Sequence, residues 1–440
     1  MAKVGIISLG CPKNTVDSEE LLGEIAEAGH EIESNASCAD VLIVNTCGFI
    51  TSAKEESIEA ILEAVQCKTN GICKSVIVTG CLVKRYGVDL ASEIPEVDAF
   101  VGPGKAGDIA EIIGKISRGE KILDTSDSGA WWKSKRSRIL STGKWTAYLR
   151  VADGCDNRCS YCAIPDIRGN FASRSETDVL DEAKSLADVG VKELNLVAQD
   201  VTRYGFDTDG RYHLAGLIDK ISSIDSIRWI RLLYCYPSRI SNELLDVIAG
   251  NPKVCKYIDV PLQHCSAHVL DMMRRPGSKS EYLALFDQIR GRCPDISLRT
   301  SFIVGFPGET DDDFNELLDF IREVEFDRTG VFRYSREDGT PASLMDNQIT
   351  KRITDKRFDK IMSVQQKISL ANNTRFIGRT LETLIESKTG DLAVGRSYRD
   401  APEIDGLVYI ENSDENAVPG NFVNVRIENI RHYDVIGKMI

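Results

Sequence analysis

The first 125 residues alternate between short apolar runs and amphipathic stretches. The apolar runs predict strands at residues 4–8, 41–45, 75–79 and 99–101. Between them, apolar residues recur at helical spacing over 18–28 and 53–65, which predicts two helices. Such alternation of strands and helices predicts a parallel, doubly wound sheet.

Residues 145 to about 372 repeat the strand–helix pattern six times. Strands are predicted at 148–151, 193–197, 229–233, 257–260, 298–304 and 330–332. Helices are predicted at 177–189, 214–221, 242–248, 282–290 and 312–324. Six such units predict an open, partial (βα)6 barrel of the TIM-like kind. In such folds the active residues lie on loops at the carboxyl ends of the strands.

The remaining segments complete the expected α/β organisation. Residues 351–376 form a long amphipathic stretch, and the short β-rich runs beyond it are punctuated by Gly and Pro. These runs, at 381–385, 407–410 and 422–427, predict a small antiparallel, OB-like β-barrel. We therefore expect an N-terminal domain, a polar linker, a central domain and a C-terminal domain at residues 1–125, 126–144, 145–372 and 373–440.

Composition narrows the possible function. The net charge of −13 argues against wide, unspecific binding to nucleic acid and is compatible with a basic protein partner. No apolar run reaches the roughly 18 residues of a membrane span, and the N-terminus turns polar by Lys13, too early for a signal peptide. We expect a cytoplasmic protein, whose thirteen cysteines would be reduced and available to metals.

The most informative stretch carries Cys155, Cys159 and Cys162 at the spacing C-x3-C-x2-C. A zinc finger normally supplies four ligands, whereas this motif supplies three. Three thiolates can hold three irons of a 4Fe–4S cubane and leave the fourth iron open to a non-protein ligand, as a catalytic cluster requires. A zinc site or a disulfide cluster is the alternative.

Three further cysteines, Cys11, Cys47 and Cys81, each follow one of the first three predicted strands. Ligands of open α/β sheets bind outside the carboxyl ends of the strands, so these thiols should converge. We therefore predict a second three-thiol cluster, with buried core cysteines as the alternative. The other cysteines receive no ligand role: Cys38, Cys67 and Cys73 lack the strand-end placement, and Cys235, Cys255, Cys265 and Cys293 are expected in the core.

The stretch 154–162, with Tyr161 before the last cysteine, resembles the signature of the radical S-adenosylmethionine (SAM) superfamily. The resemblance implies that the open iron chelates SAM, which reduction splits into methionine and a 5′-deoxyadenosyl radical. Residues 301–309 are similar to the adenine-contacting motif of the superfamily, although Ser301 stands in place of its leading glycine and a strand-ending turn explains the run equally well. The expected SAM contacts are Tyr161, Gln199, Gln263, Ile303 and Gly305.

Residues 8–19 resemble the opening of the methylthiotransferase family of radical SAM enzymes. The resemblance implies that Cys11, Cys47 and Cys81 bind an auxiliary 4Fe–4S cluster, so two clusters are expected. Asn14, Asp17 and Glu19 belong to the same opening. From the residues alone, Asp17 and Glu19 are interpreted as the first turn of a helix capped by Asp17 or Ser18.

Two other motifs depart from the patterns that they resemble. Residues 168–174 are similar to the family's Arg-Gly-x-x-Arg-Ser-Arg, but Ala172 replaces one arginine, which puts an anion contact there in doubt. His264 and His268 have the helical spacing of a metal pair. We interpret them instead as a loop histidine and a surface helix position, because no acidic or cysteine partner has matching spacing except Cys265.

The C-terminal segment resembles the TRAM domain that ends methylthiotransferases. From residue 374 to 440 it contains eight Lys or Arg and eleven Asp or Glu, so it is a poor phosphate binder. One branch of the family modifies adenosine in transfer RNA, and the other modifies an aspartate of the basic ribosomal protein S-twelve. Residues 11–14, residues 395–406 and the acidic balance resemble the second branch.

The second branch implies conversion of that aspartate to 3-methylthioaspartate, with two SAM, a sulfur donor and an electron donor such as flavodoxin or ferredoxin. Nucleic-acid contact would then not dominate binding. Two alternatives remain at this point. One is a tRNA adenosine methylthiotransferase, which needs a basic cleft, and the other is a ribosome-associated binding protein whose clusters are only structural.

Overall fold

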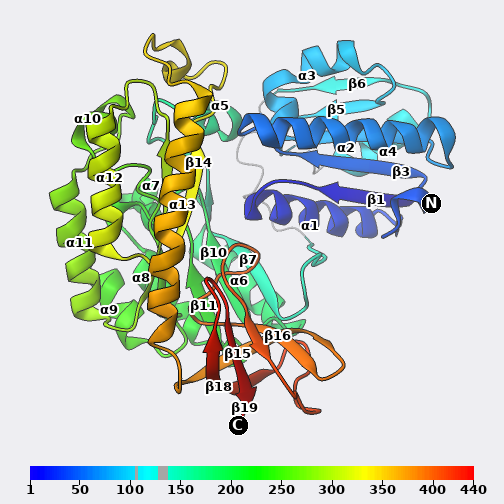
Figure 1. The fold of residues 1–440 in the computed structure, drawn as a ribbon. Coiled ribbons are helices and arrows are strands. Elements are labelled where there is room, and N and C mark those ends of the chain that lie inside the picture. The colour runs from blue at the N-terminus through cyan, green and yellow to red at the C-terminus, as the bar shows by residue number, and fades with distance from the viewer. Residues whose placement is uncertain (105–107, 127–136) are drawn as a thin grey trace.

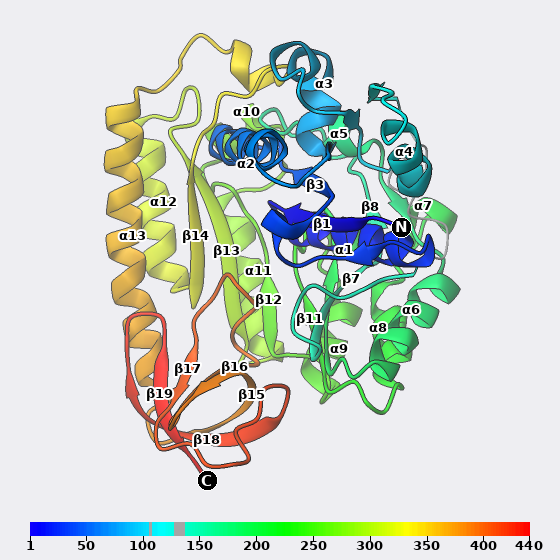
Figure 2. The same cartoon turned by 90° about the vertical axis from the view of Figure 1, so that its right-hand side faces the viewer.

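The computed structural model describes residues 1–104, 108–126 and 137–440. The chain forms three packed units (Figure 1): a sheet with helices, a partial barrel, and a small closed barrel at the C-terminus. The blue N-terminal unit packs beside the green and yellow central unit, and the orange and red C-terminal unit lies beneath the central one (Figure 2). Most of the predicted linker, residues 127–136, lies outside the described residues.

The N-terminal unit is built on a six-stranded parallel sheet in the order β2-β1-β3-β4-β5-β6. Its strands are β1 (Lys3–Ser8), β2 (Glu31–Ile32), β3 (Val41–Thr46), β4 (Ser75–Gly80), β5 (Ala99–Val101) and β6 (Ile122–Asp124). Strands β3 and β4 are buried throughout, as the continuous apolar runs of a parallel sheet require. The strand order reverses between β1 and β3, which makes their carboxyl ends the switch point of the sheet.

Helices cover both faces of this sheet, which confirms the doubly wound prediction. Apolar residues of α1 (Pro12–Glu27) and α4 (Ile109–Ile116) pack on one face. Those of α2 (Thr51–Asn70) and α3 (Cys81–Glu93) pack on the other. A short 3-10 turn, η1 (Ala36–Cys38), precedes β3.

Two details of the helix predictions were wrong. The first helix begins at Pro12 rather than at residue 18, with Cys11 at its N-cap position, so neither Asp17 nor Ser18 is a cap. Proline is favourable at the start of a helix because the first N–H groups have no partner there. In α2, only part of the predicted apolar face is buried: Ile58 and Leu62 are exposed.

The central unit is the predicted open barrel. Its parallel strands form two three-stranded sheets, β11-β10-β7 and β12-β13-β14, and a bridge between Ile230 and Val254 connects them. The strands are β7 (Thr146–Arg150), β10 (Glu193–Val197), β11 (Trp229–Leu232), β12 (Tyr257–Asp259), β13 (Ser297–Val304) and β14 (Arg328–Arg333). A small hairpin of β8 (Ala152–Asp153) and β9 (Ala172–Ser173) follows β7.

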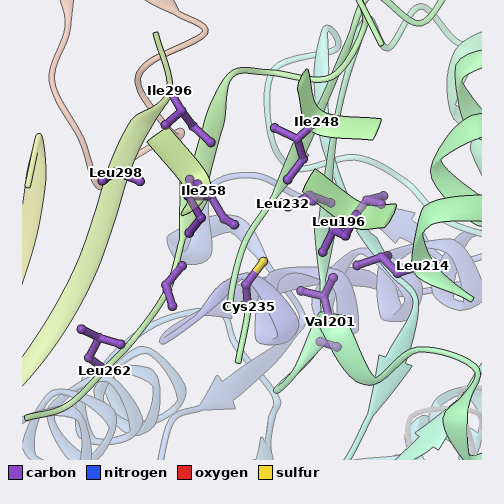
Figure 3. Packing of buried hydrophobic residues seen from close by; sticks show 14 of the residues in the cluster. Leu196, Val201, Leu214, Leu232, Cys235, Ile248, Ile258, Leu262, Ile296 and Leu298 are labelled. Carbon is purple, nitrogen blue, oxygen red and sulfur yellow. The ribbon is translucent and has the colours of Figure 1, made fainter. Parts of the chain in front are cut away.

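The outer layer of the barrel consists of helices that match the predicted ones. They are α6 (Glu176–Asp188), α8 (Leu214–Ser222), α9 (Asn242–Gly250), α11 (Lys279–Arg292) and α12 (Asp311–Val324). Shorter pieces sit on the loops: α5 (Ile164–Arg168), η4 (Val201–Arg203), α7 (Phe206–Asp209), η5 (Pro237–Arg239), α10 (Ala267–Met272) and η6 (Pro341–Leu344). Figure 3 shows Leu196, Leu232 and Ile258 within the apolar core that joins strands and helices.

The long helix α13 (Lys351–Thr374) packs on β14 and leads to the C-terminal barrel. This closed barrel has the order β15-β16-β17-β19-β18. Its strands are β15 (Thr380–Thr389), β16 (Leu392–Ser397), β17 (Val408–Ile410), β18 (Phe422–Ile430) and β19 (Val435–Met439). The prediction of an antiparallel barrel needs one correction, because β17 and β19 pair in parallel to close it. None of the helices in the described ranges has the length and apolar character of a membrane span.

Candidate functional site

The loop with Cys155, Cys159 and Cys162 lies between β8 and α5 and is held by backbone bonds at both ends. The Cys155 N–H donates to the Gly169 carbonyl (3.1 Å), and the Ser160 N–H donates to the Met273 carbonyl (3.0 Å). Gly154 precedes the loop with φ +78°, and a Cβ there would lie 2.1 Å from the Asn170 carbonyl oxygen. Only glycine fits this position without a backbone shift.

The loop thiols lie close together and beside a cation. Burial and the neighbouring Cys159 raise the pKa of Cys162 to about 12, and burial also raises the pKa of Cys155. The Arg275 guanidinium lies 3.7 Å from the Cys159 sulfur and stacks on the Tyr236 ring. A buried arginine beside a thiol favours its thiolate form, which is the form that binds iron.

The three N-terminal cysteines also converge, as predicted from their strand-end positions. Cys11 precedes α1, Cys47 follows β3, and Cys81 begins α3. Burial, Cys81 and Cys11 together raise the pKa of Cys47 to about 12, which places all three in one electrostatic neighbourhood. A Cβ on Gly10 would lie 3.1 Å from the Cys47 sulfur, so the backbone approaches the thiol directly.

Arg168, the last residue of α5, links the two cysteine sets. Its Nη2 donates to Asn14 Oδ1 and Asp17 Oδ2 (both 2.7 Å) and lies 3.6 Å from the Cys81 sulfur. Its Nη1 donates to Asp153 Oδ2 (3.1 Å), one residue before the loop with Cys155. One buried side chain therefore contacts both halves of the candidate site.

Asp153 anchors the start of the loop that carries Cys155, Cys159 and Cys162. Its Oδ1 accepts from the Gly154 N–H (2.8 Å) and from Gln199 Nε2 (2.6 Å). Burial alone would raise the pKa of Asp153, but Arg168 and Arg150 outweigh burial and hold it below the usual range. The carboxylate is thus a permanently charged partner at the centre of the site.

Asp17 and Glu19 do not form a helix N-terminal turn as interpreted from the sequence. Both are buried inside α1 and face the central unit. Asp17 accepts from Arg150 (2.5 Å) as well as from Arg168, and Glu19 pairs with Arg138 (2.5 Å). These acids therefore join the two units, which no local pattern could reveal.

The predicted SAM contacts lie at the carboxyl ends of the barrel strands. Tyr161 and Ile303 pack against one apolar cluster, which includes Phe306. Gln263 adopts φ +75°, donates its N–H to the Ser301 carbonyl (2.8 Å) and accepts from the Ile303 N–H (2.7 Å). Gln199 has an enclosed Oε1 with no partner among the described residues, so it has a free acceptor.

Gly305 has a structural reason for being glycine besides any adenine contact. Its φ is +77°, and a Cβ would lie 2.1 Å from the Thr354 hydroxyl of α13. Its N–H donates to the Glu309 carboxylate, which also pairs with Arg357 (3.0 Å). The turn after β13 is therefore fixed by buried groups of α13.

The two histidines lie where they were predicted, and the structure adds their acidic partners. His264 is in a loop and His268 is on an exposed helix face, as expected, but both have acidic partners. His264 is fully buried 3.6 Å from Glu309, and His268 lies 3.0 Å from Asp313. Each histidine has its own acidic partner, distant in sequence, so the two histidines do not form a shared metal site.

The arginines of residues 168–174 form ion pairs with acidic side chains. Arg174 pairs with Glu182, and Arg168 with the acids described above, while Ala172 lies in β9. Of the cysteines expected as buried core residues, Cys38 is exposed, which contradicts the expectation, and Cys67 is half-buried. The Cys73 thiol is buried and donates to the Ser75 carbonyl (3.2 Å), and four others are in the core. Those four are Cys235, Cys255, Cys265 and Cys293.

Both cysteine sets fit a cubane better than a single ion. In the described ranges, no group of three or more His, Cys, Asp or Glu side chains is arranged to hold one metal ion. Each set supplies three thiols, the number that would hold three irons of a cubane and leave the fourth open. The buried cations of Arg168 and Arg275 would balance the thiolate charge.

The comparisons with known proteins agree with this geometry. The model of the Radical SAM superfamily matches residues 149–321, that of the uncharacterized protein family UPF0004 matches 3–102, and that of the TRAM domain matches 377–440. The radical SAM methyltransferase TsrM from Kitasatospora setae, solved with cobalamin and a 4Fe–4S cluster, has a TM-score of 0.55 at 15% identity, covering 88% of this chain and 81% of that one. The radical SAM enzyme OxsB has a TM-score of 0.51 at 14% identity, covering 82% and 56%.

These findings define a radical SAM enzyme, a class whose cofactors are SAM and a 4Fe–4S cluster. Proteins named ribosomal protein uS12 methylthiotransferase RimO match the chain from end to end. Those of Desulforamulus reducens and Heliobacterium modesticaldum are 48% and 47% identical, each over 100% of this chain and over 100% and 95% of their own lengths. The chain belongs to this methylthiotransferase family.

Proposed function

We propose that this protein transfers a methylthio group to an aspartate of ribosomal protein uS12, yielding 3-methylthioaspartate. The relatives named for this activity support the proposal over their whole length. The observation that carries it is the pair of three-cysteine sets, which come from two structural units; Arg168 connects these units by contacting Cys81 of one set and Asp153, next to the loop of the other. A single-cluster radical enzyme would have no use for the second set.

The residues that would hold the cofactors follow from the site. Cys155, Cys159 and Cys162 would bind the cluster that cleaves SAM, and Cys11, Cys47 and Cys81 would bind the auxiliary cluster. When bound, the clusters and two SAM supply the radical and the methyl group, and a sulfur donor and a reduced flavodoxin- or ferredoxin-type protein supply sulfur and electrons. The net change on the substrate is the replacement of one C–H hydrogen by SCH3.

The residues of the chain bind and orient the cofactors and the substrate. The residues at the strand ends where SAM would lie are Gln199, Gln263, Ile303, Gly305 and Tyr161. Hydrogen bonds fix the backbone of Gln263, Ile303 and Gly305 and the side chain of Gln199. The buried ion pairs of α1 hold the N-terminal unit against the barrel, so the two cysteine sets keep a fixed separation. Fixed placement is the main contribution a protein makes to radical chemistry of this kind.

A protein substrate suits the charge of the molecule better than transfer RNA does. The C-terminal barrel has more acidic than basic residues, and the whole chain has a net charge of −13. A basic ribosomal protein is attracted by such a surface, whereas a phosphate backbone is repelled. The reaction would take place in the cytoplasm, where the substrate is made.

The first experiment measures iron and sulfide on anaerobically prepared protein, with electron paramagnetic resonance. About eight irons per chain are expected, falling to about four in a Cys155/Cys159/Cys162→Ala variant and to about four in a Cys11/Cys47/Cys81→Ala variant. The exposed Cys38→Ala change serves as control and should keep about eight. About four irons in the unchanged protein would remove the second set from the proposal.

The substrate is tested by mass spectrometry after reaction with uS12 or with transfer RNA. A gain of about 46 Da, for SCH3 in place of H, is expected on an aspartate-containing peptide of uS12 and not on RNA. Cleavage of SAM without modification of either substrate would contradict the proposal. Modification of RNA alone would assign the enzyme to the other branch of the family.

A further inference from the structure

A buried lysine ammonium lies where the N-terminal unit meets the barrel. Lys13 is the second residue of α1, two residues after Cys11, and is only 8% exposed. Its Nζ lies 3.7 Å from the centroid of the Tyr234 ring, at the carboxyl end of β11. Within the described residues, no hydrogen bond or ion pair links this ammonium to an oxygen. A lysine so deeply buried normally has an acidic partner.

The carboxylates near Lys13 already have other partners. Asp153, which faces it, accepts from Gly154 and Gln199 on one oxygen and from Arg168 on the other. Asp259, beneath Tyr234, accepts from the Tyr234 N–H (2.9 Å) and from Arg299 (2.7 Å). The site therefore has a positive group ready for an incoming anion.

Tyr234 is held in an unusual conformation that places its ring under the ammonium. Its φ is +64°, in the left-handed region that a bulky residue rarely adopts. Two hydrogen bonds fix it there: its N–H donates to Asp259, and its carbonyl accepts from the Val201 N–H (3.2 Å). Backbone strain of this kind is concentrated at functional sites. The contact brings together one residue of the N-terminal unit and one of the barrel.

We propose that the Lys13 ammonium binds the side-chain carboxylate of the substrate aspartate, with Tyr234 as the positioning residue. This inference rests on the proposed function. In aspartate the β-carbon is bonded directly to the carboxylate carbon, so an ion pair at the carboxylate places the reacting carbon next to the anchor. Lys13 follows Cys11 by two residues and contacts Tyr234 of the barrel, so a carboxylate bound to it lies where the N-terminal unit meets the barrel. Lys13 would thus make the site specific for an acidic side chain over an amide or a purine.

The test compares two probes on four forms of the reconstituted protein. The probes are uS12 and uS12 whose modified aspartate, located by mass spectrometry, is changed to asparagine. The forms are the unchanged enzyme, Lys13→Met, Lys13→Arg and the control Lys54→Met. Lys54 also lies over a tyrosine ring, Tyr86 (5.4 Å), but it has its own carboxylate partner in Glu337 (2.9 Å). Dissociation constants, iron content and substrate-free formation of 5′-deoxyadenosine are measured anaerobically.

The unchanged enzyme should bind the aspartate form more tightly than the asparagine form by about tenfold to a hundredfold, the range of a charged hydrogen bond. In Lys13→Met this ratio should fall to about one, while the iron content of about eight and the substrate-free cleavage of SAM stay unchanged. Lys13→Arg should keep most of the ratio, and Lys54→Met all of it.

Two results would overturn the assignment. One is an unchanged aspartate-to-asparagine ratio in Lys13→Met, and the other is loss of about half the iron, which would make Lys13 a support of the auxiliary cluster. If Lys13→Met does not fold, Lys13→Gln replaces it under the same criteria. Failure of the unchanged enzyme to modify uS12 at all would instead refute the proposed function, so the two failures are distinguishable.

Discussion

Arg168 shows how a single side chain can define the geometry of a two-part site. Its guanidinium contacts Asn14, Asp17 and Cys81 in the N-terminal unit and Asp153 in the barrel. Burial of such a charge is costly unless every donor has a partner, and here most of the partners are acids or a thiol. The contact therefore specifies one relative placement of the two cysteine sets.

Replacing Arg168 with glutamine should affect both stability and redox behaviour. The buried Asp17 and Asp153 would lose a cation, which should lower the free energy of unfolding by roughly 3–5 kcal/mol. Loss of positive charge beside Cys81 should also make the auxiliary cluster harder to reduce, because reduction adds negative charge. Denaturant unfolding and potentiometric titration measure the two effects.

Arg174→Gln is the matched control for this prediction, since Arg174 is also buried and pairs with Glu182 and the Arg150 carbonyl. It should reduce stability without moving the midpoint potential of the auxiliary cluster. An unshifted potential in Arg168→Gln would show that the contact with the Cys81 thiol has no electronic role.

At the scale of residues, the sequence predicted the identity of the site residues more successfully than their contacts. The cysteines could be found because each follows an apolar run, and the topology of parallel sheets brings such positions together. Arg168 stood out as part of a motif, but its partners Asn14 and Asp17 are 154 and 151 residues away. The same distance made Asp17 look like a helix cap rather than one side of a buried ion pair.

At the scale of elements, the loop between β8 and α5 depends on one glycine. A Cβ at Gly154 would meet the Asn170 carbonyl oxygen at 2.1 Å. Because that oxygen belongs to the backbone, the loop with the three cysteines would have to move. Hairpin β8–β9 and the start of α5 are too short to be recognised from a hydrophobic pattern, so the sequence did not predict this support.

The change Gly154→Ala should therefore lower the iron content from about eight to about four, with the auxiliary cluster retained. The matched control is Gly169→Ala, at a similar φ of +74° but with no atom within 4 Å of the added Cβ. It has backbone strain of about 1–3 kcal/mol without the clash, because its ψ is −165°, and it should keep both clusters. Equal iron in the two variants would contradict the steric explanation.

A second element-scale contact joins α2 and α3 to the loop after β14. Glu337, 2% exposed, accepts from Lys54 (2.9 Å) and Arg85 (2.8 Å). The change Glu337→Gln should leave two cations without a carboxylate and loosen this junction. Faster amide exchange is expected at the start of α2 and around residue 337, with the core strands unchanged.

The exposed pair of Glu428 and Lys438 provides the control for the Glu337 prediction. Both of its side chains are nearly half exposed, so Glu428→Gln should change exchange little anywhere. If exchange in Glu337→Gln matches that of Glu428→Gln, the junction does not depend on this carboxylate.

At the scale of the whole molecule, the C-terminal barrel closes the amino-terminal end of the central one. Glu193 on β10 accepts from Arg396 (2.6 Å) and Arg231 (3.0 Å), and Tyr257 donates to Asp405 (2.7 Å). The region 395–406, which served only as a family resemblance in the sequence, thus inserts its side chains beneath the barrel strands. Its structural role was not predictable because its barrel partners Glu193, Arg231 and Tyr257 are distant in the chain.

The ion pairs of Glu193 predict a pH dependence of stability. Burial raises its pKa, but Arg396 and Arg231 outweigh burial and lower the pKa to about 2 from the usual 4.5. A carboxyl with a lowered pKa stabilises the fold fully above its unfolded value, and the contribution is lost as the pH falls from about 4.5 toward 2. The shift corresponds to roughly 3 kcal/mol.

Denaturant unfolding at pH 7, 4.5 and 3 would measure this contribution as the difference between the unchanged protein and Glu193→Gln. The difference should be largest at pH 7 and shrink at pH 3, because the variant has no carboxyl to titrate at this position. A difference that is constant with pH would show that other acids account for the acid sensitivity.

The pairing of Glu193 with Arg396 also sets the order in which parts of the barrel become stable during synthesis. The two residues are 203 positions apart, so at about 5–20 residues per second the arginine is made roughly 10 to 40 s after the glutamate. Until then, the nascent barrel holds a carboxylate with only one of its two arginines. A chain truncated at residue 390 should therefore be cleaved by protease faster than the full chain, and equal cleavage would contradict this. The segment with Arg396 thus completes the ion pairs of a strand that was translated about 200 residues earlier.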